Sequence, residues 1–326
     1  MISKLLVYKA TDFNPYFNLA TEKALFESLP KDALILYLWQ NENTVVIGKN
    51  QNPWAECNCE LLKSEGGFVA RRLSGGGAVF HDLGNLNFTF IASEENLSME
   101  KNFEIIKSAC RLCKIEAELS GRNDILVKGK KFSGNAFYHS AGKAYHHGTL
   151  LLNTNSEKLA RYLTPNAEKL KAKGVKSVKS RTVNLCDIVP ELTAEKMQNA
   201  IITAAEKEFG LTAEIMDKVE ALETKKAADL FGSWDFIFGS SLPFNLTVSK
   251  RLTFGICELN LNFEKGKISK ARLFTDALDE TLSERFEGCL LGCDFSFENI
   301  KNRLEKEFER DISNELLKLI EKALMQ

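Results

Sequence analysis

Apolar and polar positions repeat with two different periods along the first half of the chain. Continuous apolar runs at 33–39 and 44–48 are typical of buried strands. The stretch 98–113 instead carries apolar side chains at the i, i+4 and i+7 spacing of a helix face, with Ser98 in the N-cap position. The pattern predicts strands at 2–8, 33–39, 44–48, 68–71, 78–81, 86–92, 124–128, 131–138 and 144–153. It predicts helices at 17–29, 53–65, 98–113 and 194–209.

A second unit begins near residue 245. The pattern there predicts, in order, a strand at 252–263, a turn at Lys265-Gly266, a strand at 266–274 and helices at 279–287, 296–309 and 312–325. Strands that pair locally, followed by helices, indicate an α+β fold. We expect a large N-terminal domain of mixed and antiparallel sheets flanked by helices over residues 1–243, and a small α/β C-terminal domain over residues 244–326.

Composition narrows the class of protein. The 326 residues are 44% hydrophobic and 27% charged, which is typical of a soluble globular chain. Lys and Arg number 43 against 44 Asp and Glu, a formal charge of -1, so no basic field argues for nucleic acid as a partner. The longest apolar run, 33–39, is far shorter than the ~18 residues of a membrane helix, and residues 1–9 lack the features of a targeting peptide. We therefore expect a cytoplasmic protein with no nucleic-acid or membrane partner.

The cysteines do not show the paired C-x-x-C spacing of a zinc ribbon. Cys110 and Cys113 fall on the apolar stripe of the helix expected at 98–113. We expect them to be small core residues with reduced thiols.

The segment 71–82 combines residue types that an ordinary strand connection does not need. The triplet from Gly75 to Gly77 weakens any regular element, so it indicates either backbone with φ > 0 or a ligand that closely approaches main-chain N–H groups. Arg71 and Arg72 precede the triplet and carry permanently charged forks suited to phosphate or carboxylate. The combination predicts an anion-binding wall. The competing interpretation is a glycine-rich turn beside solvated arginines.

Spacing excludes the common phosphate loops. A G-x-G-x-x-G motif that starts at Gly75 needs glycine at position 80, where Phe80 stands. The GK at 129–130 has neither the preceding glycine nor the following Ser or Thr of a Walker A motif. A serine hydrolase also fits poorly, because Ser74 lies outside a G-x-S-x-G motif.

A second motif runs from 121 to 136. If the chain is an extended strand from Lys131 on, Ser133 and Asn135 share the face of Lys131. An ammonium held among phosphate and carboxylate oxygens neutralises the charge that develops in acyl-phosphate chemistry. Asp124 is a candidate ligand for Mg²⁺, which prefers carboxylate and phosphate oxygens.

His146 and His147 lie shortly after this motif. No H-x-x-x-H spacing and no cysteine partner favours a metal site for them. We expect a hydrogen-bonded pair that flanks a turn, or a role in shaping a substrate site.

Together the motifs resemble a known family. RRLSGGGAVFHDLGNLNFTF, GRNDILVKGKKFSGNAF and HHGTLLLN are similar to lipoate–protein ligase A of the two-domain bacterial type, in the biotin/lipoate ligase superfamily. The similarity continues through 173–181, 251–255 and 274–278, so it covers nearly the whole chain. It implies an ATP-dependent ligase: lipoate and ATP give lipoyl-AMP and pyrophosphate, and a carrier-protein lysine then takes the lipoyl group and releases AMP. ATP is then a co-substrate with Mg²⁺ as its companion. The expected partners are lipoate and the lipoyl-carrier domains of 2-oxoacid dehydrogenase E2 subunits and the glycine cleavage H protein.

The resemblance also implies a role for each motif. Lys131 is the implied catalytic residue, in contact with the adenylate and the lipoyl carboxyl group, and the charge argument agrees. Nucleotide contacts are implied for Arg72, Gly77, Ala78, Val79, Phe80 and Lys131. Lipoate contacts are expected for Arg71, Ser74, Gly75, Gly76, Lys131 and His147. The basic run of Lys169, Lys171, Lys173, Lys176, Lys179 and Arg181 resembles a loop near the adenylate; it would also steer acidic carrier domains, and a solvated lysine-rich face is the alternative.

Other functions stay open at this point. An octanoyl or lipoyl transferase that uses a cysteine nucleophile lacks its thiol, because no cysteine occurs from 114 to 185. A transferase that uses preformed lipoyl-AMP needs the same lysine and remains an alternative. A non-catalytic carrier-binding module would need neither Lys131 nor the glycine-rich segment. Biotin ligases use a different glycine and arginine loop.

Overall fold

The computed structural model describes residues 2–121, 123–163, 182–217, 221–238, 246–264 and 267–324. The chain divides into two compact units. The first comprises Met1–Val46, Cys57–Ala70 and Val79–Ser233, and the second comprises Ile47–Glu56, Arg71–Ala78 and Trp234–Gln326. The glycine-rich segment thus groups with C-terminal residues. The domain boundary expected between residues 243 and 244 lies outside the described residues and stays a prediction.

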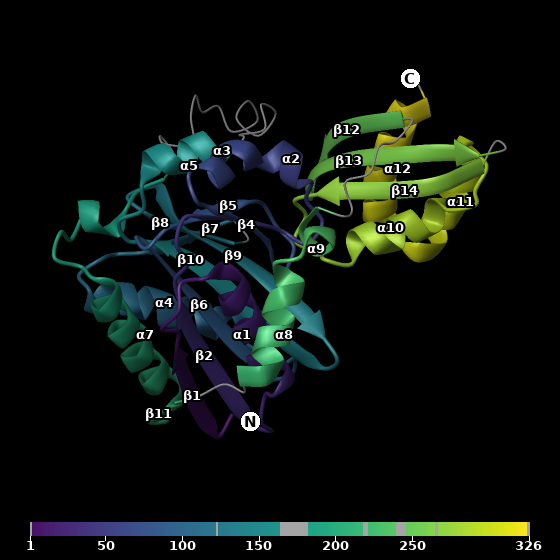
Figure 1. Cartoon of the computed structure of the whole chain (residues 1–326). Helices are drawn as coiled ribbons and strands as arrows, with labels where there is room; N and C mark the ends of the chain where they lie inside the picture. The colour runs from purple at the N-terminus through teal and green to yellow at the C-terminus, as the bar shows by residue number, and fades with distance from the viewer. Residues whose placement is uncertain are drawn as a thin grey trace. The chain divides into compact units, whose positions relative to one another are not determined.

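An eight-stranded mixed sheet forms the centre of the first unit (Figure 1). Its strands, in spatial order, are β11 (Ala213–Ile215), β1 (Lys4–Lys9), β2 (Ala33–Trp39), β6 (Asn85–Ser93), β10 (Lys143–Leu151), β9 (Lys130–Ser140), β8 (Asp124–Val127) and β7 (Glu118–Ser120). β11, β1 and β2 run parallel to one another. The pairs from β2 through β7 are antiparallel. The expected α+β class with a large mixed sheet is confirmed.

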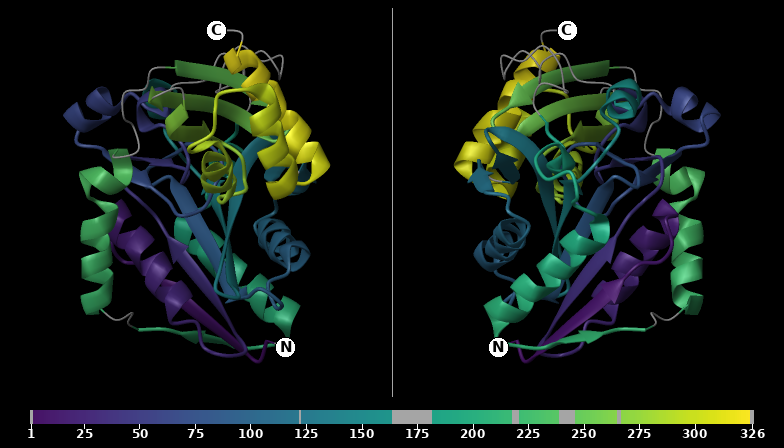
Figure 2. Two further views of the ribbon diagram at one scale, coloured as in Figure 1. Left: turned by 90° about the vertical axis from the view of Figure 1, so that its right-hand side faces the viewer. Right: turned by 90° about the vertical axis from the view of Figure 1, so that its left-hand side faces the viewer.

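The two faces of this sheet carry different helices (Figures 1 and 2). α4 (Met99–Leu112) and α7 (Ala194–Phe209) cover one face and close an apolar core with it. α1 (Pro15–Glu27) lies on the other face, with α8 (Ala221–Phe231) packed against it. The first unit is therefore a sheet between two helical layers, and the two faces of its central strands point toward different layers.

Local capping signals explain where the main helices begin and end. The side chain of Ser98 accepts a hydrogen bond from the Lys101 amide, which confirms the predicted N-cap of α4. α7 coincides with the predicted helix and ends at Gly210, whose φ of 64° is the left-handed conformation of a C-terminal cap. α1 begins earlier than predicted, because Asn14 caps it and Pro15 fits its first turn.

The predicted helix at 53–65 is interrupted. The chain forms α2 (Pro53–Glu56) and α3 (Cys59–Ser64) instead, because Asn58 leaves the helical conformation and accepts a hydrogen bond from the amide of Leu61. A separate three-stranded sheet has the order β4 (Phe68–Arg71), β3 (Thr44–Ile47) and β5 (Val79–His81). Between residues 155 and 230, the described part of the chain forms α5 (Ser156–Tyr162), a 3-10 turn (Leu185–Asp187), α7, β11 and α8.

The C-terminal part of the second unit is an antiparallel sheet covered by helices. The sheet has the order β12 (Leu246–Leu252), β13 (Gly255–Glu264) and β14 (Lys267–Thr275), and the helices are α10 (Leu282–Leu290), α11 (Phe297–Glu307) and α12 (Arg310–Leu324). The short helix α9 (Trp234–Phe238) precedes this sheet in the chain. The predicted stripes of α11 and α12 enter one apolar core with the sheet. β13 corresponds to the strand predicted at 252–263, whereas β12, which precedes it, was not predicted.

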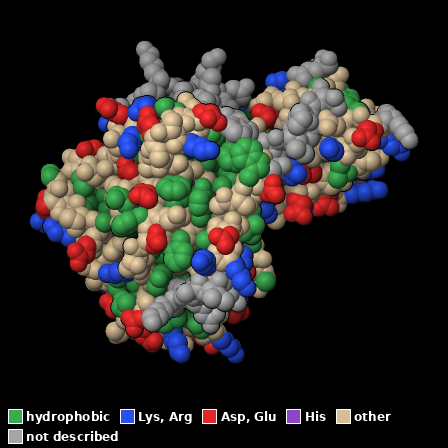
Figure 3. Space-filling view, viewed as in Figure 1, with side chains coloured by type: hydrophobic (Ala, Val, Ile, Leu, Met, Phe, Trp, Pro, Cys, Tyr) green, Lys and Arg blue, Asp and Glu red, His purple; other side chains and the backbone are tan. Residues whose placement is uncertain are grey.

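Charged side chains of both signs lie on the face of the molecule drawn in Figure 3. Acidic and basic groups are interspersed there among the described side chains, in keeping with the formal charge of -1. In the part of the chain that the structure describes, no helix is long and apolar enough to cross a membrane.

Candidate functional site

A tight hairpin leads into the strand that carries Lys131. Val127 at the end of β8 pairs with Lys130 at the start of β9, so only two residues form the turn. These residues, Lys128 and Gly129, have φ values of 50° and 72°. Two successive positive φ values match the right-handed twist of the strands. The turn therefore sets the register in which β9 begins.

A β-bulge at Phe132 then changes the face to which the following residues point. Leu126 pairs with Lys131, but the next residue of β8, Ile125, pairs with Ser133, so Phe132 is the extra residue. Phe132 and Ile125 are fully buried in the core under α4 and α7. Ser133 thus lies on the core face, opposite to Lys131. The expectation that Lys131 shares a face with Ser133 and Asn135 is wrong, because it assumed an unbroken alternation.

The ammonium of Lys131 is held on the opposite face by a carboxylate. Its Nζ lies 2.6 Å from Oδ1 of Asp124, and the two side chains are 35% and 24% exposed. The lysine side chain runs over Gly134, where a Cβ atom would come within 2.9 Å of Nζ. The carbonyl of Lys131 accepts a hydrogen bond from Val183. The site therefore presents a fixed but accessible cation, whose partner an incoming anion can displace.

The donors around Asp124 fit Mg²⁺ poorly. Its carboxylate is already engaged with the ammonium of Lys131. In the described part of the chain, no group of three or more His, Cys, Asp or Glu side chains could hold a metal ion. Mg²⁺ is commonly held by one or two carboxylates together with substrate phosphates, so a complete protein cage is not required. The assignment of Asp124 to Mg²⁺ stays a prediction, and we derive no step through a metal.

His147 lies on the same face of the sheet as Lys131. It pairs with Ala136, two residues after Gly134 on β9. Its Nδ1 lies 2.9 Å from Oε1 of Glu22 on α1. The hydroxyl of Thr89, the residue opposite His147 on β6, donates to the same oxygen at 2.7 Å. A carboxylate buried beneath α1 thus fixes the orientation of this histidine.

Three side chains form this buried network with His147, namely those of Glu22, Thr89 and Trp39, and the sequence argument missed all three. Glu22 is only 2% exposed, and Trp39 donates its Nε1 hydrogen to the hydroxyl of Thr89 at 3.1 Å. A signal for Glu22 does exist: it falls between Leu19 and Leu25 on the apolar stripe of α1. A charged residue on such a stripe indicates a buried partner, but the stripe does not say which one.

His146 points to the opposite face and has a different environment. It is fully buried, and its Nε2 lies 3.0 Å from Oδ1 of Asn135. Burial holds the pKa of His146 well below its ordinary value, and the neighbouring His147 adds to this shift. The two adjacent histidines therefore belong to two different sets of side chains.

Arg71 of the glycine-rich segment serves as a backbone clamp. Its side chain is buried and donates hydrogen bonds to main-chain carbonyls of two segments, namely those of Gly48, Lys49, Gln51, Phe236 and Ile237. Burial, with a smaller contribution from Arg272, lowers the pKa of the Arg71 guanidinium to about 10. This network joins three stretches of the second unit. The predicted lipoate contact of Arg71 stays a prediction.

Arg72 holds the glycine triplet itself. Its guanidinium donates to the Ser74 hydroxyl at 3.0 Å and to the carbonyls of Gly75 and Gly77 at 2.7 and 2.8 Å. Gly76 has a φ of 88°, and its amide donates to the carbonyl of Ala277 at 2.9 Å. The expected positive φ is thus found within the triplet.

The close approach expected at the triplet is made by the protein's own backbone. A Cβ atom on Gly75 would lie 2.6 Å from the carbonyl oxygen of Ala277 and 2.7 Å from that of Leu278. After the triplet, Val79 and Phe80 enter β5, and the Phe80 ring is buried against Tyr162. The nucleotide contacts predicted for 77–80 stay predictions.

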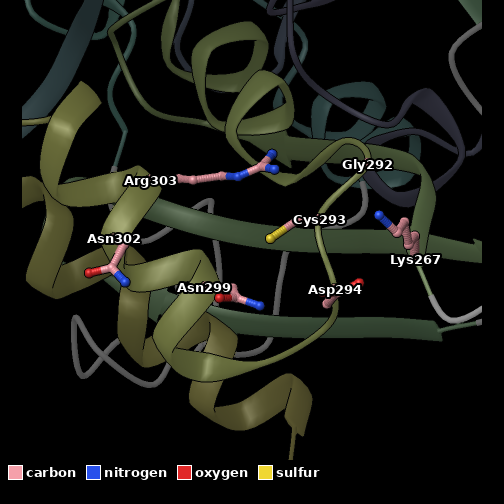
Figure 4. Close-up of a pocket in the computed structure, with 7 residues that line it drawn as sticks. All are labelled: Lys267, Gly292, Cys293, Asp294, Asn299, Asn302 and Arg303. Atoms are coloured by element: carbon pink, nitrogen blue, oxygen red, sulfur yellow. The ribbon is translucent and has the colours of Figure 1, made fainter.

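A cavity of about 350 Å³ lies in the C-terminal part of the second unit (Figure 4), and none of the residues that line it belongs to the sequence motifs. It is lined by Lys267, Gly292, Cys293, Asp294, Asn299, Asn302 and Arg303. Arg303 reaches from α11 toward the loop at Gly292 and donates to the carbonyls of Cys289 and Leu291. Its guanidinium therefore braces this loop.

Comparison with known proteins decides the family. A model of the lipoyl protein ligase A/B catalytic domain matches residues 14–206, and one of the bacterial lipoate protein ligase C-terminus matches residues 241–324. Lipoate-protein ligase A of Psychrobacter cryohalolentis is 41% identical over 313 residues, which cover 93% of this chain and 92% of that protein. The chain belongs to the lipoate–protein ligase A family. The family resemblance of the sequence motifs and the predicted enzyme class, a ligase of lipoylation, are thereby confirmed.

Other relatives agree with this membership. Lipoate-protein ligase A of Bdellovibrio bacteriovorus is 39% identical over 300 residues, which cover 89% of this chain and 88% of that protein. The solved structure of P. falciparum LipL1 in complex with lipoate has a TM-score of 0.86 at 33% identity and covers 97% of this chain and 99% of that one. A lipoate-protein ligase A bound with ATP has a TM-score of 0.63 at 25% identity, with coverage of 73% and 99%. The fold of this chain is thus shared with one structure that holds lipoate and another that holds ATP.

Some predicted features of this ligase lie outside the described residues. The basic run Lys169–Arg181 falls within 164–181, which the structure does not describe. Its expected place near the adenylate, its expected attraction for acidic carriers and the alternative of a solvated face all stay predictions.

Proposed function

We propose that this ligase activates free lipoate with ATP to lipoyl-AMP and then transfers the lipoyl group to a lysine of a carrier domain. The observation that carries the proposal is the half-exposed ammonium of Lys131, held by Asp124 on a rigid sheet. Family membership, together with the lipoate-bound and ATP-bound relatives, supports both substrates. Preformed lipoyl-AMP as the only substrate is the alternative that the experiment below excludes.

Charge neutralisation is the role of Lys131 in the first step. A lipoate carboxylate oxygen attacks the α-phosphorus of ATP, a new O–P bond forms, and the bond to the leaving pyrophosphate breaks. Both reactants are anionic, so a fixed cation between the carboxylate and the α-phosphate lowers their repulsion without reorganisation at the moment of reaction. The Asp124 carboxylate holds the ammonium in place until substrate oxygens replace it.

The same ammonium acts in the second step. The carrier lysine, as a neutral amine, attacks the acyl carbon of lipoyl-AMP, and the C–O bond to AMP breaks as the amide forms. The amine loses its proton to solvent, and AMP leaves as the anion. Lys131 stabilises the oxyanion that develops on the acyl oxygen and the phosphate of the departing AMP.

The other assignments of the proposal rest on the family resemblance. Arg72 and residues 77–80 contact the nucleotide, and Arg71, Ser74, Gly75, Gly76 and His147 contact lipoate. The carriers are lipoyl domains of 2-oxoacid dehydrogenase E2 subunits and the glycine cleavage H protein, and a solved neighbour is described as a bipartite lipoate protein ligase with its E2 lipoyl domain. Mg²⁺ enters only as the companion of ATP, with no further protein ligand assigned. The cytoplasmic location stays a prediction.

Pyrophosphate release without any carrier protein tests the proposal. The full chain is mixed with ATP, Mg²⁺ and lipoate, and pyrophosphate and lipoyl-AMP are measured with labelled ATP. Lys131→Ala should lower the rate by at least about 100- to 1000-fold, the loss expected on removing one group that stabilises a transition-state charge. Lys130→Ala is the matched control, because Lys130 is an exposed neighbour on the same strand.

The outcomes separate the candidate functions. Lipoate-dependent pyrophosphate from the wild type and from Lys130→Ala, but not from Lys131→Ala, supports the ligase. No pyrophosphate from the wild type, with transfer from added lipoyl-AMP intact, identifies a transferase. If the wild type shows neither pyrophosphate release nor transfer, only a carrier-binding module remains. A wild-type yield of adenylate from Lys131→Ala would refute the role of Lys131.

A further inference from the structure

On the core side of β9, the side chain of Asn135 joins the first of the two adjacent histidines to the segment that carries Asp124. It is 5% exposed and forms hydrogen bonds at both ends of its carboxamide. Its Nδ2 donates to the carbonyl of Asn123 at 2.9 Å and to the hydroxyl of Ser133 at 3.3 Å. Its Oδ1 lies 3.0 Å from Nε2 of His146. The orientation of the carboxamide follows from its partners, since the Asn123 carbonyl only accepts.

The proton of His146 is fixed by the same reasoning. Oδ1 of Asn135 is an acceptor, so Nε2 of His146 carries the hydrogen and Nδ1 does not. Nδ1 has no hydrogen-bond partner in the described structure. Burial lowers the pKa of the imidazole, which keeps it neutral and in this one tautomer. The ring is enclosed by four aromatic side chains, those of Phe88, Phe90, Phe103 and Phe137.

The polypeptide makes room for this contact. A Cβ atom on Gly148 would lie 2.3 Å from Oδ1 of Asn135 and 2.5 Å from Cζ of Phe88. Only glycine at this position of β10 lets the carboxamide enter beside the imidazole. Glycine in a strand and buried polar groups both destabilise a fold unless other contacts compensate. The compensating contacts here lie at the other end of the Asn135 side chain.

The far end of the carboxamide holds the residue directly before Asp124. The amide and the Nδ2 of Asn135 both donate to the carbonyl of Asn123, and the side chain of Asn123 donates back to the carbonyl of Asn135 at 3.0 Å. These bonds lie beside the bulge that turns Lys131 to the other face. They fix the start of β8, and with it the carboxylate of Asp124 that holds Nζ of Lys131.

We infer that His146 and Asn135 are positioning residues for the ion pair of Lys131 and Asp124. The imidazole orients the carboxamide, the carboxamide holds Asn123, and Asn123 sets the carboxylate that aims the ammonium. Neither residue touches a substrate in this arrangement. The inference deepens the proposed function and rests on the role given there to Lys131. It explains why the first histidine faces a hydrophobic core rather than the face of Lys131.

Substitutions at His146 test the first contact. His146→Leu removes the donor to Asn135, whereas His146→Gln keeps an N–H at a similar position. We expect His146→Leu to lower kcat of lipoate-dependent pyrophosphate release by about 10- to 100-fold, the loss that a displacement near 1 Å causes, with KM for lipoate and ATP nearly unchanged. His146→Gln should recover most of this loss. Phe137→Leu is the control for packing. The ring centroid of Phe137 lies 4.8 Å from that of His146, and a phenyl ring makes no hydrogen bond of the kind that Asn135 makes.

Asn135→Asp tests the second contact and covers the case in which His146→Leu fails to fold. The new carboxylate keeps the acceptor for His146 but repels the carbonyl of Asn123. It should lower kcat like His146→Leu in the wild-type background and have no further effect in a Lys131→Ala background. If Asn135→Asp lowers kcat by the same factor in both backgrounds, Asn135 acts independently of Lys131, and the inference is overturned.

A measurement that needs no turnover separates this inference from the proposed function. Acetic anhydride labels lysine amines, and mass spectrometry gives the ratio of labelling at Lys131 to that at its neighbour Lys130. Release of Lys131 from Asp124 should raise this ratio several-fold in His146→Leu and Asn135→Asp but not in His146→Gln or Phe137→Leu. An unchanged ratio in the first two variants overturns the positioning role even if the wild type is active. If the ratio rises in these two variants while the wild type forms no lipoate-dependent pyrophosphate, the result counts against the proposed function and not against the positioning role.

Discussion

The carboxylate of Glu22 on α1 lies 2.9 Å from Nδ1 of His147 on β10, a contact between residues 125 positions apart. Both residues are buried, at 2% and 7% exposure. The same oxygen accepts the hydroxyl hydrogen of Thr89. One helical carboxylate thus satisfies donors from two strands and ties α1 to the face of the sheet that carries Lys131. A charged residue is tolerated on the apolar stripe of α1 because these partners replace the water it loses.

Removal of this carboxylate should destabilise the fold. Glu22→Ala leaves the hydrogens of Thr89 and His147 buried without an acceptor, and we expect the free energy of unfolding to fall by about 1–3 kcal/mol. Glu22→Gln keeps an acceptor oxygen and should cost less. Urea unfolding measures both. Glu27→Ala, on the same helix but exposed, is the control and should change stability by at most about 0.5 kcal/mol. Equal stability of Glu22→Ala and Glu27→Ala would contradict the importance of the buried contact.

The space above Gly134 should be essential for Lys131. In Gly134→Ala the new Cβ would lie 2.9 Å from Nζ and 3.2 Å from Cε of the lysine, so the side chain must move away from Asp124. We expect lipoate-dependent pyrophosphate release to fall by about 10- to 100-fold while the protein stays folded. Gly288→Ala on α10 is the control, because nothing lies within 4 Å of its Cβ position. A wild-type rate in Gly134→Ala would show that this contact does not set the lysine position.

The close backbone packing of the glycine triplet should make Gly75 intolerant of a side chain. Two carbonyl oxygens stand in the way of its Cβ, and backbone cannot yield as the end of a flexible side chain does. We expect Gly75→Ala to lower the free energy of unfolding by about 1–3 kcal/mol. Thermal unfolding compared with Gly288→Ala, which adds a methyl group to a helix without a clash, checks this. A loss no larger than that of the control would refute the packing argument.

Alkaline pH should weaken the core under α4 through Cys110. Burial raises the pKa of this thiol from its ordinary value of 9.0 to about 12. Between these two values the unfolded chain loses the thiol proton while the folded chain keeps it, so the stability that this group contributes is complete below pH 9 and is lost as the pH rises toward 12. Cys110→Ala should therefore show a shallower decline than the wild type.

Urea unfolding from pH 8 to pH 10.5 gives the two slopes. Other titrating groups affect both proteins equally, so only the difference between the slopes reports on Cys110. Alkylation of the native protein gives a second measurement, since the Cys110 thiol should stay unlabelled at pH 8 because it is fully buried. Parallel slopes together with rapid labelling of Cys110 would be incompatible with the proposed burial effect.

Local features of the sequence determined many of the elements. Ser98 and the apolar stripe behind it predicted α4 with its cap, and the apolar stripe of 194–209 predicted α7 with its bounds. The motifs also singled out Lys131 and the glycine triplet as unusual. These predictions succeeded because capping, helical period and positive φ depend on a few neighbouring residues.

The tertiary structure alone decided which of these residues meet. The bulge at Phe132 is a property of the pairing between β8 and β9. No local pattern predicts that Ile125 pairs with Ser133 and leaves Phe132 unpaired. The bulge puts Lys131 on one face and Ser133 and Asn135 on the other, so a one-residue shift reassigns every neighbour. The contact of Glu22 with His147 likewise depends on how a helix docks on a sheet. Alternation along a strand is encoded locally, but register and docking are set by the whole fold, and these place the cation and its supports.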